Sequence, residues 1–183
     1  IFADHYNDQI FENNNINIGI IYRNYQESNR EIELKKIAKA CKKRRYQLFV
    51  SNDIKLALKE KADGVYIPSF NKSRKFINLE KKNFTIIGSA HNQRQIHEKI
   101  SQRCKAIFLS PIFYVGKSNN FLDLYKFNLL TFSNKVKFFA LGGINSQNIK
   151  KLKLLRIVGF AGIRIFKKKT GLLKAGFLKK KFF

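Results

Sequence analysis

The sequence predicts a compact (β/α)8 barrel, the TIM-barrel fold, formed by residues 1–183 as one domain. Three observations predict this fold. Short apolar runs rich in Ile, Val and Phe alternate with longer, lysine-rich stretches of helical period. Eight such runs occur, and no linker divides the chain. This alternation is typical of βα units around a parallel sheet, and eight units favour a closed barrel over an open sheet.

The eight expected strands leave room for short connections only. They cover residues 1–3, 18–22, 47–50, 64–67, 85–88, 106–109, 138–141 and 160–165. Pro68 and Pro111, the two prolines, each follow the end of an expected strand, where a missing backbone N–H is tolerated. The chain is also shorter than the roughly 200 to 400 residues usual for this fold, so its loops must be minimal.

The intervening helices are expected at residues 30–43, 54–61, 93–103, 146–155 and 172–181. Several are preceded by capping residues: Asn29 or Ser28 before the first, Asn52 or Asp53 before the second, and Asn145 before the fourth. Residues 4–17 are the weakest segment, because three consecutive asparagines at 13–15 oppose a regular helix.

The composition favours a cytoplasmic globular protein. No apolar run reaches the roughly 18 residues of a membrane span, and residues 1–17 show neither the basic start nor the apolar core of an export signal. Cys41 and Cys104 are far apart and match no metal-ligand spacing, so we expect neither a disulfide nor a zinc site.

The 37 Lys and Arg residues against 12 Asp and Glu give a formal net charge of +25, which attracts polyanions. The lysines are spread over every expected helix, and no zinc-finger, RNP-like or basic heptad motif accompanies them. We therefore expect solvated charge, with no nucleic-acid or membrane partner. The alternative from another class is a basic module that binds nucleic acid or an anionic membrane through residues 167–183, which we interpret instead as the last barrel helix. The sequence leaves open whether the chain forms a homo-oligomer.

Active sites of this fold collect at the carboxyl ends of the strands, so the polar residues that directly follow each apolar run are the candidates. They are Arg23, Asn52, Asp53, Ser69, Ser89, His91, Asn92, Ser110, Lys117, Gly142 and Gly143.

A phosphate site is expected after the last two strands. Gly142 and Gly143 stand between a strand and a helix, where backbone N–H groups can approach an anion closely. The next unit, residues 159–167, adds a second turn of small residues and the cations that follow it, with Phe166 and Lys167 at its end. The alternative is that the two glycines form only a tight turn.

Two side chains are candidates for chemistry. His91 lies in a loop, where an imidazole can donate and accept a proton, although it could instead cap the following helix. Asp53 could bind Mg²⁺ together with phosphate oxygens, although it too could serve as a helix cap.

In their order, these motifs resemble the superfamily of thiamine phosphate synthase and the TenI thiazole tautomerase, over residues 19–166. The resemblance rests on five segments. They are Ser51-Asn52-Asp53-Ile54, Ala62-Asp63-Gly64-Val65-Tyr66-Ile67, Gly88-Ser89-Ala90-His91-Asn92, Leu109-Ser110-Pro111-Ile112-Phe113 and Ala140-Leu141-Gly142-Gly143-Ile144.

The resemblance implies a transferase that couples an aminopyrimidine diphosphate to a thiazole phosphate and releases diphosphate with Mg²⁺ as cofactor. Its partners would be these small phosphorylated metabolites. By the same resemblance, the residues that would bind the diphosphate, its metal and the pyrimidine are Arg23, Asn52, Asp53, Ser89 and Lys117. Those that would bind the thiazole phosphate are Gly143, Phe166 and Lys167. Departing diphosphate concentrates negative charge, which cations and fixed donors stabilise.

The sequence departs from the synthase pattern at catalytic positions. The segment that usually reads Gln-Leu-Arg-x-Lys is Ile21-Tyr22-Arg23-Asn24-Tyr25 here. Asn71 stands where the synthases have an acidic metal ligand after the fourth strand. Ile67-Pro68-Ser69 instead resembles the tautomerase branch, in which His91 would be the central residue and no diphosphate takes part. A catalytically inert relative that binds phosphorylated ligands is the third reading.

Overall fold

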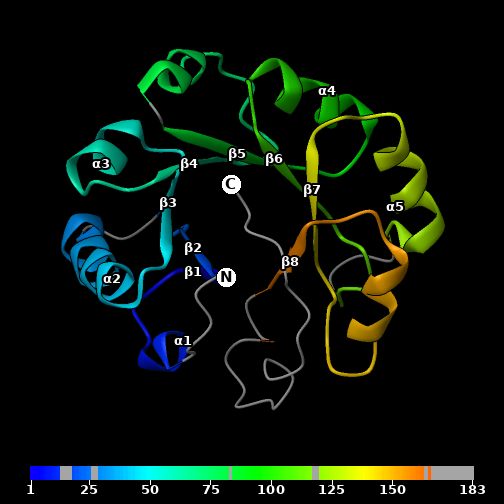
Figure 1. The fold of residues 1–183 in the computed structure, drawn as a ribbon, viewed down its shortest axis with the longest axis horizontal. Helices are drawn as coiled ribbons and strands as arrows, with labels where there is room; N and C mark the ends of the chain where they lie inside the picture. Colours follow the sequence, from blue (N-terminus) through cyan, green and yellow to red (C-terminus); the bar gives the residue numbers. More distant parts are fainter. Residues whose placement is uncertain (13–17, 26–28, 83, 117–119, 163–164, 166–183) are drawn as a thin grey trace.

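The eight expected strands form a parallel, nearly closed barrel (Figure 1). The computed structural model describes residues 1–12, 18–25, 29–82, 84–116, 120–162 and 165. The strands are β1 Phe2–Ala3, β2 Gly19–Tyr22, β3 Gln47–Ser51, β4 Gly64–Ile67, β5 Thr85–Ala90, β6 Ala106–Leu109, β7 Lys137–Leu141 and β8 Gly159–Ala161. Each pairs with the next in chain order, and the Phe2 amide donates to the Gly162 carbonyl over 3.4 Å. The predicted fold class is confirmed.

The helices lie outside this ring of strands (Figure 1). They are α1 Asp8–Phe11, α2 Arg30–Arg44, α3 Ile54–Lys59, α4 Gln93–Ser101 and α5 Asp123–Phe132, with 3-10 helices η1 Ile77–Lys82 and η2 Ile149–Leu154. Asp53 and Asn92 cap α3 and α4 with their side chains, accepting from the amides of the third residues beyond them. Asn29 precedes α2 without a side-chain cap.

Two expected elements differ from the structure. The segment at 146–155, predicted as a regular helix, contains the 3-10 helix η2 at Ile149–Leu154, and the Asn145 side chain accepts from the backbone amides of Gln147 and Asn148 in the turn before it. The eighth strand ends at Ala161 rather than 165, and Ile165 has a helical conformation. The expected helix at 172–181 lies outside the described residues.

Helix α5 is absent from the sequence-based expectations. It buries Phe127 and Thr131 but leaves Tyr125, Leu129 and Phe132 exposed. Apolar residues therefore lie on more than one face of this helix. Without a single apolar face, the period of 3.6 residues that marks other helices is not visible in the sequence.

The barrel has two separate apolar cores. The inner core fills the barrel with side chains from all eight strands: Phe2, Ile21, Phe49, Tyr66, Ile87, Ala106, Phe108, Phe139 and Ala161. Aromatic contacts organise it, with ring centroids 5.3 Å apart for Phe2 and Tyr66 and 4.8 Å for Phe108 and Phe139. The outer core packs the strands against the helices. Since the barrel interior is filled, a ligand must bind at one end.

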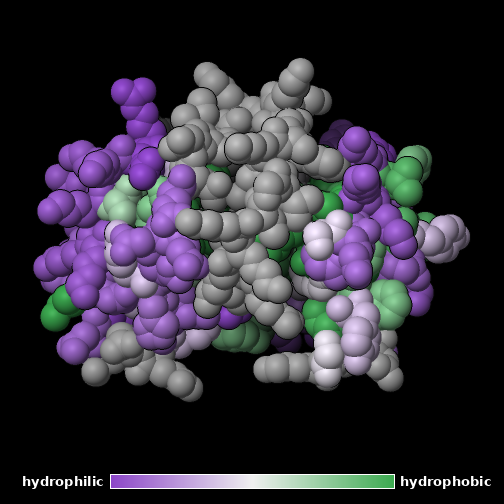
Figure 2. Space-filling model, turned by 90° about the horizontal axis from the view of Figure 1, so that it is seen from below, coloured by the Kyte–Doolittle hydropathy of each residue, from purple (hydrophilic) through white to green (hydrophobic). Residues whose placement is uncertain are grey.

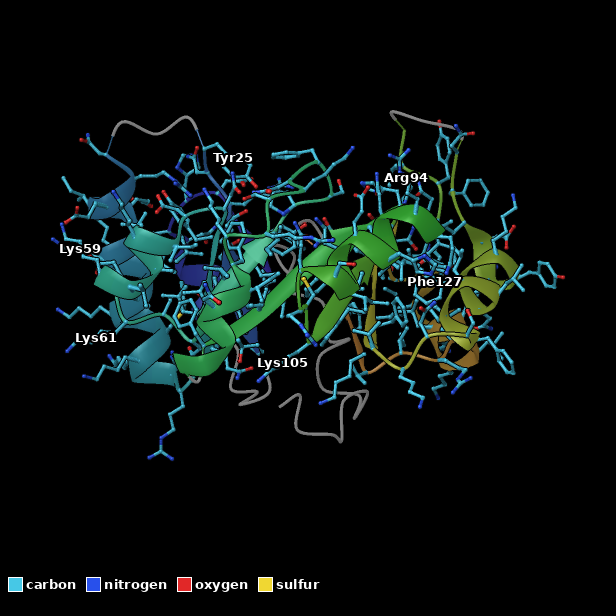
Figure 3. All side chains as sticks on the ribbon, turned by 90° about the horizontal axis from the view of Figure 1, so that it is seen from above. Tyr25, Lys59, Lys61, Arg94, Lys105 and Phe127 are labelled. Atoms are coloured by element: carbon cyan, nitrogen blue, oxygen red, sulfur yellow. The ribbon has the colours of Figure 1, made fainter. Side chains whose placement is uncertain are left out.

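The basic charge is spread over the surface. Lys59 and Lys61 lie at the end of α3, Arg94 lies on α4 and Lys105 directly precedes β6, so that these cations are spread around the barrel in Figure 3. Hydrophilic residues cover much of the coloured surface in Figure 2. Within the described residues, no helix is long and apolar enough to cross a bilayer. Among the lysines whose burial the structure describes, Lys99 is the exception, because its side chain is fully buried.

Candidate functional site

A polar pocket of about 480 Å³ lies at the carboxyl end of the barrel. Its position follows from strand geometry, because side chains alternate along a strand and a residue two positions beyond an inner-core residue also points toward the barrel axis. Asp4, Arg23, Ser89 and Ser110 stand in this relation to Phe2, Ile21, Ile87 and Phe108. The complete lining is Asp4, Arg23, Asn24, Tyr25, Tyr66, Pro68, Ser69, Phe70, Ser89, His91, Ser110 and Leu141. Tyr25 marks this end of the barrel in Figure 3, opposite Lys61 and Lys105.

His91 is held at this pocket by both ring nitrogens. Nδ1 lies 2.8 Å from the Ser110 carbonyl oxygen, and because a carbonyl oxygen only accepts, Nδ1 carries a proton. Nε2 lies 3.1 Å from the Ser69 hydroxyl, which donates to it when the ring is neutral. The alternative that His91 caps the next helix is wrong, since Asn92 caps it. The arrangement orients the imidazole, and in its neutral form the basic nitrogen is Nε2.

The charged groups of the pocket are paired. Arg23 Nε lies 3.4 Å from the Asp4 carboxylate, and the guanidinium also lies over the Phe2 ring at 5.5 Å from its centroid. Asp4 and Arg23 are the only Asp, Glu, Lys or Arg residues in the described lining of the pocket. The described lining therefore has little net charge, in contrast to the chain as a whole.

The floor of the pocket contains a buried phenol. Burial raises the pKa of Tyr66 to about 12, and a hydrogen bond with Ser89 opposes this shift. Tyr66 consequently stays protonated and can donate a hydrogen bond throughout the physiological pH range. Ser89, predicted to lie near a substrate ring, is buried beside it and lines the pocket.

The expected Mg²⁺ ligand, Asp53, is engaged elsewhere. Its Oδ1 accepts from the backbone amide of Leu56 at 2.9 Å, and its Oδ2 pairs with Arg30 at 3.0 Å. Asn52 has φ +59°, and its side-chain oxygen accepts from the side-chain Nδ2 of Asn71. Neither Asn52 nor Asp53 lines the pocket.

Among the residues with described positions, no three His, Cys, Asp or Glu side chains gather as a metal site. The carboxylate of Asp53 is hydrogen bonded to a backbone amide and neutralised by the Arg30 guanidinium. Asn71 stands where the synthase pattern has an acidic residue. The residues present in this corner do not fit a Mg²⁺ site of that pattern.

Gly142 and Gly143 have the positive φ angles, +93° and +70°, that favour glycine. A Cβ on Gly142 would lie 2.8 Å from Pro111, and one on Gly143 would lie 2.5 Å from the Phe113 carbonyl oxygen. The loops after β6 and β7 are also joined by backbone hydrogen bonds, including Ile112 N to Leu141 O at 2.9 Å. This close approach requires both glycines whether or not a ligand binds, so the phosphate role stays a prediction.

Three predicted site residues, Lys117, Phe166 and Lys167, lie outside the described residues. Of the others, the structure brings Arg23, Ser89 and His91 together at one pocket. The sequence-based candidates omitted the other seven lining residues. They are Asp4, Asn24, Tyr25, Tyr66, Pro68, Phe70 and Leu141. Extending the alternation of β1 by one inward position would have found Asp4, and Tyr66 is itself an inward residue of β4.

A buried network behind the pocket also escaped sequence reasoning. Lys99 Nζ donates to the Asn71 carbonyl at 2.7 Å and to Gln102 at 2.9 Å, and burial lowers the pKa of Lys99. The Gln102 amide donates to the carbonyls of Asn71 and Ser73, each at 2.9 Å. Helix α4 thus fixes the loop that carries Ser69.

We expect Gln102→Leu to lower the free energy of unfolding by about 1–3 kcal/mol, because it removes two hydrogen bonds and leaves a buried ammonium with one partner fewer. Urea unfolding measures this change. Gln147→Leu, at an exposed side chain, is the matched control and should change stability by less than about 0.5 kcal/mol. Equal stability of the two variants would contradict the role given to Gln102.

Known proteins resemble this chain over most of its length. The family model described as thiamine monophosphate synthase matches residues 14–166. A thiamine-phosphate synthase of Prochlorococcus marinus subsp. pastoris is 33% identical over 142 residues, which are 74% of this chain and 40% of that protein. A putative thiamine-phosphate synthase 2 of Aquifex aeolicus is 30% identical over 140 residues, 73% of this chain and 75% of that protein. The chain spans about two fifths of the length of the Prochlorococcus relative.

A solved structure titled thiamine phosphate pyrophosphorylase, from Pyrococcus furiosus, superposes with a TM-score of 0.74 at 18% identity. The alignment covers 92% of this chain and 84% of that one, and supports the barrel fold. The match of the family model extends over the segments that build the pocket, including the loops of Arg23, Ser89 and His91. The chain therefore belongs to the thiamine monophosphate synthase family.

Proposed function

We propose that this chain is an enzyme of thiamine biosynthesis that moves a proton on a thiazole phosphate, the tautomerase reaction of the superfamily. The observation that carries the proposal is the imidazole of His91, held at the pocket between the Ser110 carbonyl and the Ser69 hydroxyl. An imidazole held in a fixed orientation beside a substrate-sized pocket is the arrangement that general acid–base catalysis needs.

The proton transfer can be followed on this chain's residues. Nε2 of His91 removes a proton from the ring of the substrate, and the imidazolium that forms keeps its Nδ1–H bond to the Ser110 carbonyl. The same nitrogen then returns a proton to a substrate carbon outside the ring, so that the product is the aromatic isomer and the imidazole is again neutral. Ser69 holds the basic nitrogen before the substrate arrives.

The phosphate of the substrate would bind near the loops after β7 and β8. The proposal for Gly142 and Gly143 rests on their place at the end of β7, beside the Leu141 side of the pocket. Phe166 and Lys167 are proposed as its further ligands on the family resemblance alone.

The second candidate is the coupling reaction with release of diphosphate, which the printed names of the relatives favour. Arg23 in the pocket suits it as well. Against it stands the pairing of Arg23 with Asp4, which leaves little positive charge free for a diphosphate in the described lining. The pairing of Asp53 with Arg30 also engages the expected metal ligand.

Two assays on the purified protein separate these candidates. Tautomerisation of the thiazole phosphate, followed by NMR, should proceed equally with and without EDTA. Coupling with an aminopyrimidine diphosphate and Mg²⁺ should release no diphosphate. Metal-dependent diphosphate release without tautomerisation would establish the second candidate. Turnover in neither assay, with thiazole phosphate still bound in calorimetry, would identify an inert relative.

A further inference from the structure

Two aromatic side chains are exposed at the mouth of the pocket. Phe70 is 68% and Tyr25 45% exposed, although both line it. Their rings contact each other edge to face, with centroids 6.4 Å apart and an interplanar angle of 71°. Exposed aromatic surface at the mouth of a pocket costs free energy unless a ligand covers it, and ligand sites commonly use such surface.

The Tyr25 ring is held in place from several sides. Its hydroxyl lies 2.6 Å from the Ser51 hydroxyl, and the Arg30 guanidinium lies 5.8 Å from the ring centroid. Arg30 is itself fixed by the Ser51 carbonyl and by Asp53, each at 3.0 Å. The ring is therefore oriented before any ligand binds, which reduces the entropy lost on binding.

The charges around the pair are compensated. Arg30 is paired with Asp53, and Arg23 is paired with Asp4. Neither arginine is therefore an unpaired cation beside Tyr25 and Phe70. A diphosphate or a metal–phosphate complex needs such charge. An uncharged, planar ring does not, and it gains from stacking on aromatic surface.

We infer that Tyr25 and Phe70 form a recognition site for an uncharged planar heteroaromatic ring, which stacks on the exposed Phe70 face. This site would orient the thiazole ring of the substrate toward His91, whose partner Ser69 immediately precedes Phe70. The inference deepens the proposed function and rests on it for the identity of the ring. Phe70 acts here as a residue that determines specificity.

NMR titration with the phosphate-free hydroxyethyl methylthiazole tests this site without any turnover. Phe70→Ala should weaken binding of this ring about tenfold, and Phe70→Trp should retain it within about twofold. Phe70→Leu, which is apolar but not planar, should bind as weakly as Phe70→Ala. The matched control is Phe132→Ala on α5, 74% exposed and away from the pocket lining, which should bind as wild type does.

Three results would overturn the inference: no binding of the phosphate-free ring by the wild-type protein, full binding by Phe70→Leu, or displacement of the ring by inorganic diphosphate. Failure of the proposed function gives a different result. In that case ring binding depends on Phe70 as described, while the wild-type protein does not tautomerise thiazole phosphate. Circular dichroism of each variant confirms that a loss of binding is not a loss of folding.

Discussion

Replacing His91 with alanine is expected to slow tautomerisation of thiazole phosphate by about 10²–10⁴-fold, the usual contribution of a positioned acid–base group. The loss should fall on kcat, because the phosphate and the ring of the substrate are bound by other residues. Ligand affinity, measured by calorimetry, should change by less than about threefold. The physical reason is that only His91 places a proton-accepting nitrogen with a defined lone pair at this pocket within the described residues.

His97→Ala is the matched control for this experiment. His97 is exposed on α4, contacts Gln93 at 2.7 Å and does not line the pocket at the barrel end. Its replacement should leave kcat unchanged. A His91→Ala variant that turns over at the wild-type rate would disprove the proposed role of the imidazole, whatever its effect on binding.

Gly143→Ala is expected to destabilise the protein by at least about 2 kcal/mol. The residue has φ +70°, which costs a side chain about 1–2 kcal/mol. The added Cβ would also lie 2.5 Å from the Phe113 carbonyl oxygen and 2.6 Å from that of Tyr114, so the loop after β6 must move. Thermal and urea unfolding measure the loss.

Gly116→Ala serves as the control, because a Cβ at Gly116 meets no heavy atom within 4 Å. Its effect on the free energy of unfolding should be small. If Gly143→Ala were as stable as Gly116→Ala, the close approach of the loops after β6 and β7 would not be a constraint on the sequence, and glycine would be needed there only for a ligand.

Part of the site could be predicted from the sequence, and the reason is geometric. Strand ends in a parallel barrel meet at one rim, so Arg23, Ser89 and His91 could be expected together from their places after apolar runs. Asp53 shows the limit of this reasoning. Its place after a strand is equally that of a helix cap, and the pairing with Arg30, 23 residues away, depends on how α2 packs beside α3.

The fold class was determined by local pattern: eight apolar runs, separated by lysine-rich stretches of helical period, predict the eight strands of the barrel. Tertiary structure alone decided the contacts between distant segments, such as Tyr25 with Phe70, Lys99 with Asn71, and Gly143 with the loop after β6. It also formed α5, whose apolar residues lie on more than one face. Periodicity records which side of an element is buried, whereas the partner of a side chain across the barrel is set by packing that no short window of sequence contains.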